Sequence, residues 1–409
     1  MIAMAFQLRS RFLGAIVLFT SVGDSFSQDP GSGVSLPSGF ARQRAVVDAA
    51  SSGKSSEGGL DFSLRLDTVF DSNARQASGE GVSEIESDVI FTPALSATYL
   101  TGNRRWKLGV DFDLSRNEYV DQDDLSATNY ALGGYGRYNS KKLQASLSTG
   151  FSRGGGINRR TGVFLEQFSY YSQLSARYRL TGKTSLEASW DGRFSESRTS
   201  GFTDTTSHTA SLYAIWKARP RIELGPGFRW GSRTGFDDAE FEVMGPGLKL
   251  NYKFGAKVDF SSELGLNYTD SPSGDDDELL NWSVALKYRA SARWGLDLAM
   301  IQDTEASLST GGGFDEVTAF RLTHWRKVRR GRLNLSLDYA EREPATNQAG
   351  GGVARRDFDY LEARCAFLMP VYRDEAGLEV SLAYRELDSD LPDDSWGGWL
   401  FGVGIDWQF

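Results

Sequence analysis

The sequence has little of the chemistry that enzymes and metal proteins use. It has one cysteine, Cys365, which excludes an intramolecular disulfide, and two histidines, His208 and His324, that lie far apart in the chain. It has no phosphate-binding loop, no dinucleotide fingerprint and no cysteine–histidine cluster spaced for a metal. We therefore predict that the protein is not an enzyme, with no catalytic residues, no metal site and no cofactor.

Long apolar runs are also missing after the first two dozen residues. A membrane-spanning helix needs about 20 consecutive apolar residues, so that class of protein is excluded. The net charge of −9 argues against nucleic acid as a partner. Glycine, with 45 residues, and aromatics, at 12%, are plentiful, and together they suit short strands joined by tight turns.

Residues 1–27 have the layout of a secretory signal peptide. Arg9 and Arg11 precede an apolar run at 12–22, and Ser25 and Ser27 are small residues before the expected cleavage after position 27. An amphipathic helix of a soluble domain is the alternative. Residues 28–58 are rich in Gly, Ser and Ala, which predicts a flexible periplasmic segment, although a short helix at 40–49 is also compatible.

From residue 59 to residue 409, stretches of about ten residues alternate between apolar and polar side chains. Trp106, Leu108 and Val110, for example, are separated by Lys107 and Gly109. Successive residues of a strand face opposite sides, so each stretch predicts a strand with one apolar face. A soluble β-sandwich would alternate as well, with its apolar face inward.

Two features favour a transmembrane barrel over a sandwich. Short links alternate with longer polar loops along the chain, which is the pattern of short periplasmic turns and long outer loops. Counting them predicts an all-β, antiparallel up-and-down barrel of about 18 strands, with a range of 16–18. Aromatics also gather at strand ends, where two membrane interfaces would select them. They include Tyr99, Trp106, Tyr178 and Trp216 near short turns, and Tyr119, Tyr268 and Trp399 near loops.

The last strand has its own signature. An aromatic-rich alternating strand that ends in Phe resembles the signal read by the barrel assembly machinery, and an edge strand of this kind can be templated by another sheet. We expect it to pair with the first strand near residues 60–69. The residues of this assembly signal are Phe401, Val403, Ile405, Trp407 and Phe409.

The polar face predicts a belt of ion pairs near the short turns. Opposite charges directly across strands stabilise a sheet by under about 1 kcal/mol each. The expected members are Arg177, Glu187, Lys217, Glu223, Lys249, Lys253, Asp259, Glu263, Lys287, Asp297, Arg364 and Glu379. A solvated polar lumen with mixed charges is the alternative. Tyr135, Tyr171 and Tyr213 also face the lumen by parity.

Just after the first predicted strand comes the segment Phe70-Asp71-Ser72-Asn73-Ala74. It resembles a Tyr-Asp-Ser-Asn-Val-like segment of the outer-membrane β-barrel porin family of the exopolysaccharide-associated type. The resemblance covers residues 60–409 in length, turn pattern and terminal Phe. It implies an outer-membrane barrel connected with surface polysaccharide, and it implies no catalytic residues.

These patterns together predict a porin-like barrel in the outer membrane of a Gram-negative bacterium, passing small hydrophilic solutes or saccharides without catalysis. The alternative is an export-associated or structural surface barrel with a blocked lumen and loops that bind a partner. The expected partners are outer-membrane lipid and lipopolysaccharide, the barrel assembly machinery and periplasmic chaperones. The sequence leaves the oligomeric state open.

Overall fold

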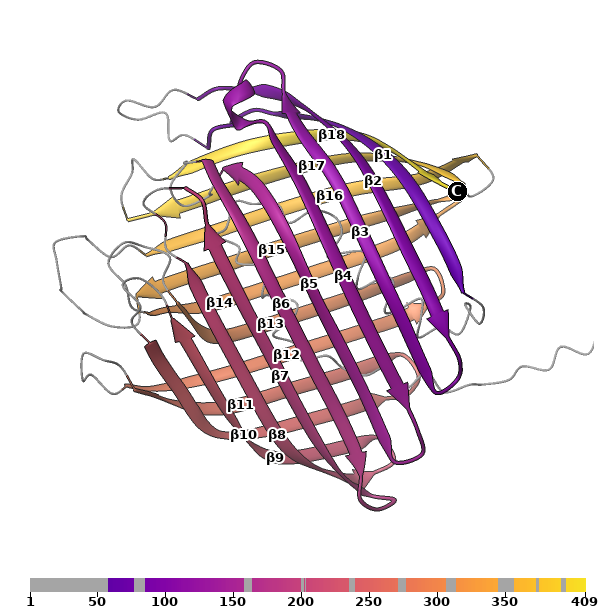
Figure 1. Cartoon of the computed structure of the whole chain (residues 1–409), viewed down its shortest axis with the longest axis vertical. Helices are drawn as coiled ribbons and strands as arrows, with labels where there is room; N and C mark the ends of the chain where they lie inside the picture. The colour runs from indigo at the N-terminus through magenta and orange to yellow at the C-terminus, as the bar shows by residue number, and fades with distance from the viewer. Residues whose placement is uncertain are drawn as a thin grey trace, which may run out of the picture.

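The alternating segments form eighteen antiparallel strands in the computed structural model (Figure 1). The structure describes residues 58–76, 85–157, 164–199, 202, 204–234, 240–270, 277–306, 314–344, 357–372, 375–390 and 395–409. The strands are β1 (Gly59–Asp71), β2 (Asp88–Gly102), β3 (Trp106–Tyr119), β4 (Ala127–Asn139), β5 (Leu143–Ile157), β6 (Phe164–Arg179), β7 (Thr184–Ser197), β8 (Thr205–Arg219), β9 (Ile222–Thr234), β10 (Glu240–Phe254), β11 (Val258–Asp270), β12 (Asp277–Ser291), β13 (Trp294–Ala306), β14 (Phe314–Val328), β15 (Gly331–Pro344), β16 (Phe358–Tyr372), β17 (Ala376–Ser389) and β18 (Trp396–Gln408).

Each strand pairs with the strands before and after it, and the sheet closes on itself because β1 pairs with β18. In this closing pair, Ser63 lies opposite Gln408 and Asp71 opposite Leu400. The predicted fold class, the number of strands and the closure of the last strand onto the first are confirmed. A closed sheet leaves no unpaired strand edge.

The connections alternate in length as predicted, with two to four residues at one end of the barrel and longer segments at the other. One long connection contains the only described helix, the 3-10 turn η1 (Asp123–Leu125). No helix among the described residues is long and apolar enough to cross a membrane. The predictions for residues 1–27 and 28–57 lie outside the described residues.

The two faces of the sheet have opposite character. On β1, Leu60, Phe62, Leu64 and Leu66 share one face and are 55%, 43%, 49% and 52% exposed. The five residues of the predicted assembly signal, four on β18 and Phe409 just after it, are likewise all exposed. The other face must be the enclosed one, because side chains from non-neighbouring strands meet there, as Lys249 of β10 meets Glu187 of β7.

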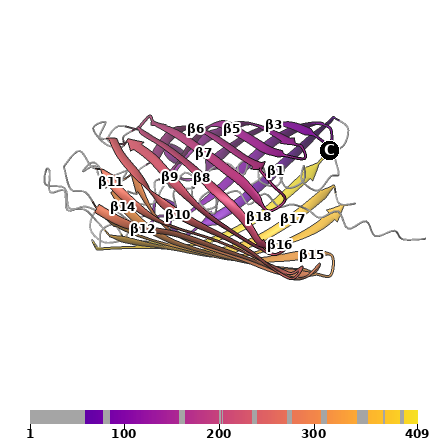
Figure 2. The ribbon, with the colours of Figure 1, turned by 90° about the horizontal axis from the view of Figure 1, so that it is seen from below.

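The barrel is a flattened tube. Figures 1 and 2 show β2–β7 as one wall and β11–β16 as the opposite wall, with their strands crossing at an angle. Strands β8–β10 turn the corner between the two walls at one side, and β17, β18 and β1 do so at the other. The second of these corners holds the junction between the first and last strands.

The aromatic side chains named in the sequence prediction face outward near the strand ends, with one exception. Trp106 and Trp216 near the short turns, and Trp399 near the loops, are outward and exposed. The placement of Tyr119 was wrong: its neighbour Glu118 lies opposite the outward-facing Phe91, so Tyr119 faces inward. The outward position there is charged because β3 extends beyond the apolar band.

Candidate functional site

The enclosed face of the barrel is the candidate site, and it is lined by polar and charged side chains. Asp111 and Asp113 of β3 are 3% and 5% exposed, and Asn281 of β12 donates a hydrogen bond to Asn267 of β11 at 2.7 Å. An enclosed polar face requires partners for each group, because an unpaired buried polar group is costly. Much of this face is therefore a network of side chains that bridge strands.

The register of the predicted belt is as expected. Lys253 lies opposite Asp259, Lys249 opposite Glu263, and Lys287 opposite Asp297. Arg177 and Glu187 are also opposed, as are Lys217 and Glu223. Turn length predicts the first three pairings, because a hairpin of known link length has one register, whereas the Lys217–Glu223 pairing follows a register shift between Lys217 and Arg219.

Several ion pairs nevertheless join strands that are not neighbours, instead of the residues that lie directly opposite each other. Arg177 Nη2 lies 3.0 Å from Glu223 Oε2, although β6 and β9 are not neighbours. Lys249 Nζ lies 2.7 Å from Glu187 and 3.7 Å from Glu263. In this part of the belt, ion pairs connect strands three places apart. They can form because the wall is curved, which brings these side chains together.

Elsewhere the belt is incomplete. Arg364 and Glu379 are paired at 2.7 Å, whereas the Asp297 carboxylate accepts hydrogen bonds from Arg289 Nη1 and Nη2, at 2.7 and 3.0 Å. Arg289 was not among the predicted members. Lys217, Lys253 and Asp259 form no ion pair with any described residue. Lys217 and Lys253 each lie beside a cationic turn residue of the neighbouring hairpin, Lys183 and Arg221 respectively.

Tyr213 of β8 lies at the centre of a cluster of enclosed side chains. It is 1% exposed, its hydroxyl donates to Glu263 Oε1 at 2.6 Å, and Lys249 Nζ lies 4.7 Å from its ring centroid. Together with Glu187 these residues form what we call the Tyr213 cluster. It joins four strands, β7, β8, β10 and β11, in the corner between the two walls.

Two Gly-Pro-Gly segments make room for this cluster. They occupy 225–227 of β9 and 245–247 of β10, and Gly227 lies directly opposite Gly247. A methyl group on Gly247 would lie 2.7 Å from the Tyr213 hydroxyl, and one on Gly227 would overlap the ring. The repeated Gly-Pro-Gly segment was the one sequence signal that could have revealed this corner, since Gly within a strand marks a close approach.

A second bridge closes the same corner nearer the loops. Arg229 Nη2 of β9 lies 2.6 Å from Asp303 Oδ2 of β13, and Arg233 of β9 lies 3.7 Å from the same carboxylate. β9 and β13 are four places apart in the sheet, yet their backbones come within 8 Å Cα–Cα. Strands four places apart on a flat sheet would be roughly 19 Å apart, so the wall folds back on itself here and narrows the lumen.

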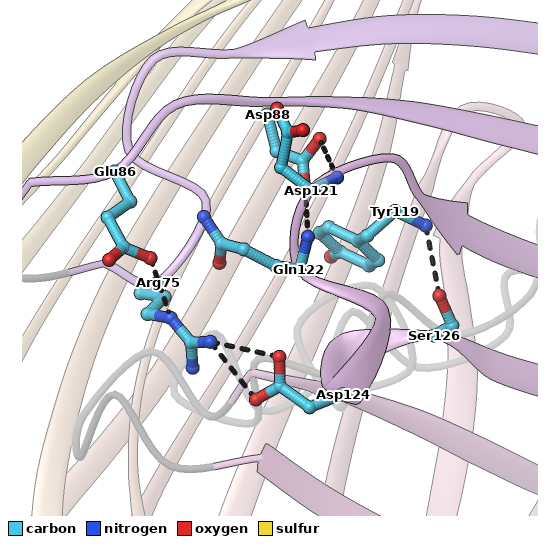
Figure 3. Close-up of polar contacts among 8 residues, drawn as sticks. All are labelled: Arg75, Glu86, Asp88, Tyr119, Asp121, Gln122, Asp124 and Ser126. Atoms are coloured by element: carbon cyan, nitrogen blue, oxygen red, sulfur yellow. Dashed lines mark hydrogen bonds and ion pairs between the residues drawn. The ribbon is translucent and has the colours of Figure 1, made fainter.

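The loops next to β1 and β3 are clamped together (Figure 3). Arg75 lies 2.9 Å from Glu86 and from Asp124. The carboxylate of Asp88 accepts backbone N–H groups of Val120, Asp121 and Gln122 in the β3–β4 connection. Burial and hydrogen bonds to Glu86 and Asp124 act in opposite directions on the pKa of Arg75, and the net effect raises it. This clamp joins the described parts of the β1–β2 and β3–β4 connections to each other.

The segment that carried the family resemblance lies at the barrel junction. Asn73 is 1% exposed and its side chain donates to the carbonyl of Gly397 at 3.1 Å. The backbone of Ser72 donates to the Trp399 carbonyl, and its hydroxyl accepts the Trp399 N–H. The segment thus has a structural role here, because it fastens the outer end of β1 onto β18.

The two histidines do not share a site. His208 stacks on Trp190 at 5.9 Å and His324 packs on Trp294 at 5.9 Å between ring centroids. His208 lies near the loop end of β8, whereas His324 lies near the short-turn end of β14. Within the described part of the chain, no group of three His, Cys, Asp or Glu side chains could hold a metal ion.

No family model matches the chain, and no curated protein matches it. Among solved structures, the chain is similar to OccAB3 of Acinetobacter baumannii, at 12% identity and a TM-score of 0.42, over 86% of this chain and 99% of that one. It is similar to OpdK of Pseudomonas aeruginosa, solved with vanillate, at 11% identity and 0.45, over 86% and 99%. It is also similar to the copper transporter OprC, at 9% and 0.47, over 87% and 81%. At these identities and TM-scores the likenesses carry no argument about function.

Proposed function

We propose that the chain is an outer-membrane channel that passes small hydrophilic solutes or saccharides and performs no catalysis. The observation that carries this proposal is the inverted polarity of the barrel: large apolar side chains are exposed outside, whereas charged and amide side chains are enclosed. Exposed apolar surface on all sides is unfavourable in water and favourable in lipid. A closed barrel also satisfies every backbone hydrogen bond within a bilayer.

In this proposal the short turns face the periplasm and the long connections face outward. The N-terminal 27 residues direct secretion, residues 28–58 form a periplasmic segment, and the last strand is read by the assembly machinery. The outward bands of aromatic side chains lie at the two lipid interfaces. Lipid and lipopolysaccharide would then surround the wall.

The test is single-channel recording in a planar bilayer. We expect the refolded, heat-modifiable protein to form a stable open pore with conductance on the order of a nanosiemens, since barrels of 16–18 strands leave an aqueous channel. Silence from a protein that is folded by the gel-shift criterion would contradict the channel function.

The second candidate is an export-associated or structural barrel with a blocked lumen, linked to exopolysaccharide. The narrowing by the Tyr213 cluster and by the Arg229–Asp303 bridge favours it, because both remove open space from one side of the tube. In that case the clamped loops at Arg75 and Asp88 would present a surface to a partner. Silent bilayers together with copurification of a surface polymer would support this candidate over the channel.

A further inference from the structure

The short-turn end of the barrel is strongly cationic. Seven of the eight short turns, from 103–105 to 329–330, contain no Asp or Glu, and all of their cations are exposed; the eighth, 373–375, has the sequence Arg-Asp-Glu. The cations of the seven turns are Arg104, Arg105, Lys141, Lys142, Lys183, Arg221, Lys257, Arg293, Arg329 and Arg330. At the other end, the sequence of the nine long connections contains fifteen Asp or Glu and six Arg. The charge of the chain is thus divided between the two rims.

Five successive backbone hydrogen bonds at this rim each join two cationic residues. In every case a strand residue donates its N–H to the carbonyl of a turn residue on the neighbouring hairpin, at 2.7–2.9 Å. We call these the cationic rungs, and they are Arg179 to Lys142, Lys217 to Lys183, Lys253 to Arg221, Arg289 to Lys257, and Lys327 to Arg293.

This arrangement is unfavourable for an isolated barrel, because like charges directly across a strand pair repel. Arg289 is paired with Asp297, and Lys217 and Lys253 have Glu223 and Asp259 opposite them on their other neighbouring strand; apart from Arg289, the members form no ion pair with a described residue. The repulsion is repeated five times around one side of the rim. Such a repeat is explained if an anion neutralises it during function.

The strand members of the rungs face the lumen rather than the lipid. Lys217 follows the outward Trp216, and Lys253 lies between the outward Tyr252 and Phe254. Arg289 packs over the inward-facing ring of Trp325 at 5.8 Å. Lumen-facing cations reach a solute in the mouth more readily than a lipid headgroup outside the wall. A cluster of charges of one sign at a low-dielectric opening also concentrates counter-ions there.

We propose that the cationic rungs capture soluble hydrophilic anions, those that carry phosphate or carboxylate groups, at the short-turn mouth of the barrel. This deepens the proposed function by naming the class of solute and the side on which it binds. The ion pairs of the belt lie deeper and largely cancel, so the unbalanced charge is at the mouth. Binding should weaken as ionic strength rises, because exposed charges are screened.

The test uses inorganic tripolyphosphate and the full-length barrel in a non-ionic detergent, with binding measured by calorimetry. The rung variant replaces Lys183, Lys217, Arg221 and Lys253 by Gln. The matched control replaces the same number of cations in the sequence of the long connections, Arg159, Arg160, Arg355 and Arg356, by Gln. The gel shift on heating confirms that each variant is folded.

We expect the rung variant to bind tripolyphosphate about tenfold more weakly or worse, and the control to stay within about twofold of the wild type. Equal affinities for the two variants, or no binding by the wild type, would overturn the proposal. The measurement is repeated in nanodiscs of phosphatidylcholine with and without phosphatidylglycerol. If phosphatidylglycerol abolishes binding, the rungs belong to lipid headgroups and the solute proposal is wrong. Because calorimetry needs no conductance, a silent bilayer would contradict the channel function alone.

Discussion

Asp71 of β1 accepts a hydrogen bond from Arg385 of β17 at 2.7 Å, across the intervening strand β18. Both side chains are enclosed, with 6% and 12% of their surfaces exposed. Between them β18 presents Gly398, where a methyl group would lie 3.1 Å from the Cβ of Asn73. The pair therefore holds the first strand to the last two, at the place where the barrel closes.

We predict that Asp71→Asn destabilises the closed barrel strongly. The substitution keeps the shape but leaves the Arg385 charge enclosed and unbalanced, which costs about 3–5 kcal/mol in known cases. The measurement is the free energy of unfolding from urea titration in detergent, followed by tryptophan fluorescence. Glu118→Gln is the control, because the Arg116–Glu118 pair is 56% and 44% exposed and should contribute under about 1 kcal/mol. Similar losses in both variants would show that the junction is not special.

Gly227→Ala should destabilise the corner between the two walls. The added methyl overlaps the ring of Tyr213, which is enclosed and cannot move away freely, so overpacking of about 1–3 kcal/mol is expected. Gly182→Ala is the control, since no atom lies within 4 Å of the added methyl. The two variants are compared by their urea midpoints, and a neutral Gly227→Ala would mean that the Tyr213 ring is not fixed where the structure places it.

Tyr213→Ala should widen the lumen. The ring joins Glu263 and Lys249 in the narrowed corner, so its removal opens space for water and ions. We expect a higher single-channel conductance than in the wild type. Tyr170→Ala is the control, because Tyr170 is 44% exposed on the outer face and does not line the lumen. An unchanged conductance for Tyr213→Ala would place the narrowest part of the pathway elsewhere.

Removal of Phe409 should impair assembly more than stability. Its side chain is 69% exposed, so deletion removes few contacts: the ring contact with Trp407 and one hydrogen bond from its N–H to the Phe62 carbonyl. We expect a lower yield of folded protein in the outer membrane, measured by cell fractionation, and an unchanged unfolding midpoint for the purified barrel. Phe254→Ala, at a position 63% exposed near the same rim, should have little effect on yield. Equal yields for the two variants would show that the terminal Phe is not part of the assembly signal.

Asp357→Asn should stabilise the barrel at neutral pH and have no effect in acid. Burial and the neighbouring carboxylates of Asp390 and Asp359 raise the pKa of Asp357 above its usual value of 3.8. A carboxyl group with a raised folded-state pKa imposes no penalty below its unfolded pKa, and it costs stability as the pH rises through the folded pKa. The gain at pH 7 should be under about 1 kcal/mol, because the side chain is exposed. Thermal midpoints at pH 3 and pH 7 test this, and a gain of equal size at both values would exclude a charge effect.

For much of the site, the sequence predicted which residues lie opposite each other, but not which side chains form ion pairs. The opposition of Lys253 to Asp259 followed from the three-residue turn between them, yet neither residue pairs with the other. On their other side, Lys217 and Lys253 lie across from the turn cations Lys183 and Arg221, to whose carbonyls they donate their backbone N–H groups. Side chains of Lys and Arg are long and select among several partners, so register alone does not decide the pairs.

The sequence by itself determined the strands, their number, their order and their two faces. All four depend on local properties: alternation has a period of two residues, and a short turn sets the register of the hairpin that it closes. Only the tertiary structure decided where the wall bends. Tyr213, Arg229 and Asp303 meet because strands several places apart are brought together, and Asp71 meets Arg385 because the sheet closes. Contacts between side chains of distant strands depend on the curvature of all the strands together, so the alternation and the turn lengths do not specify them.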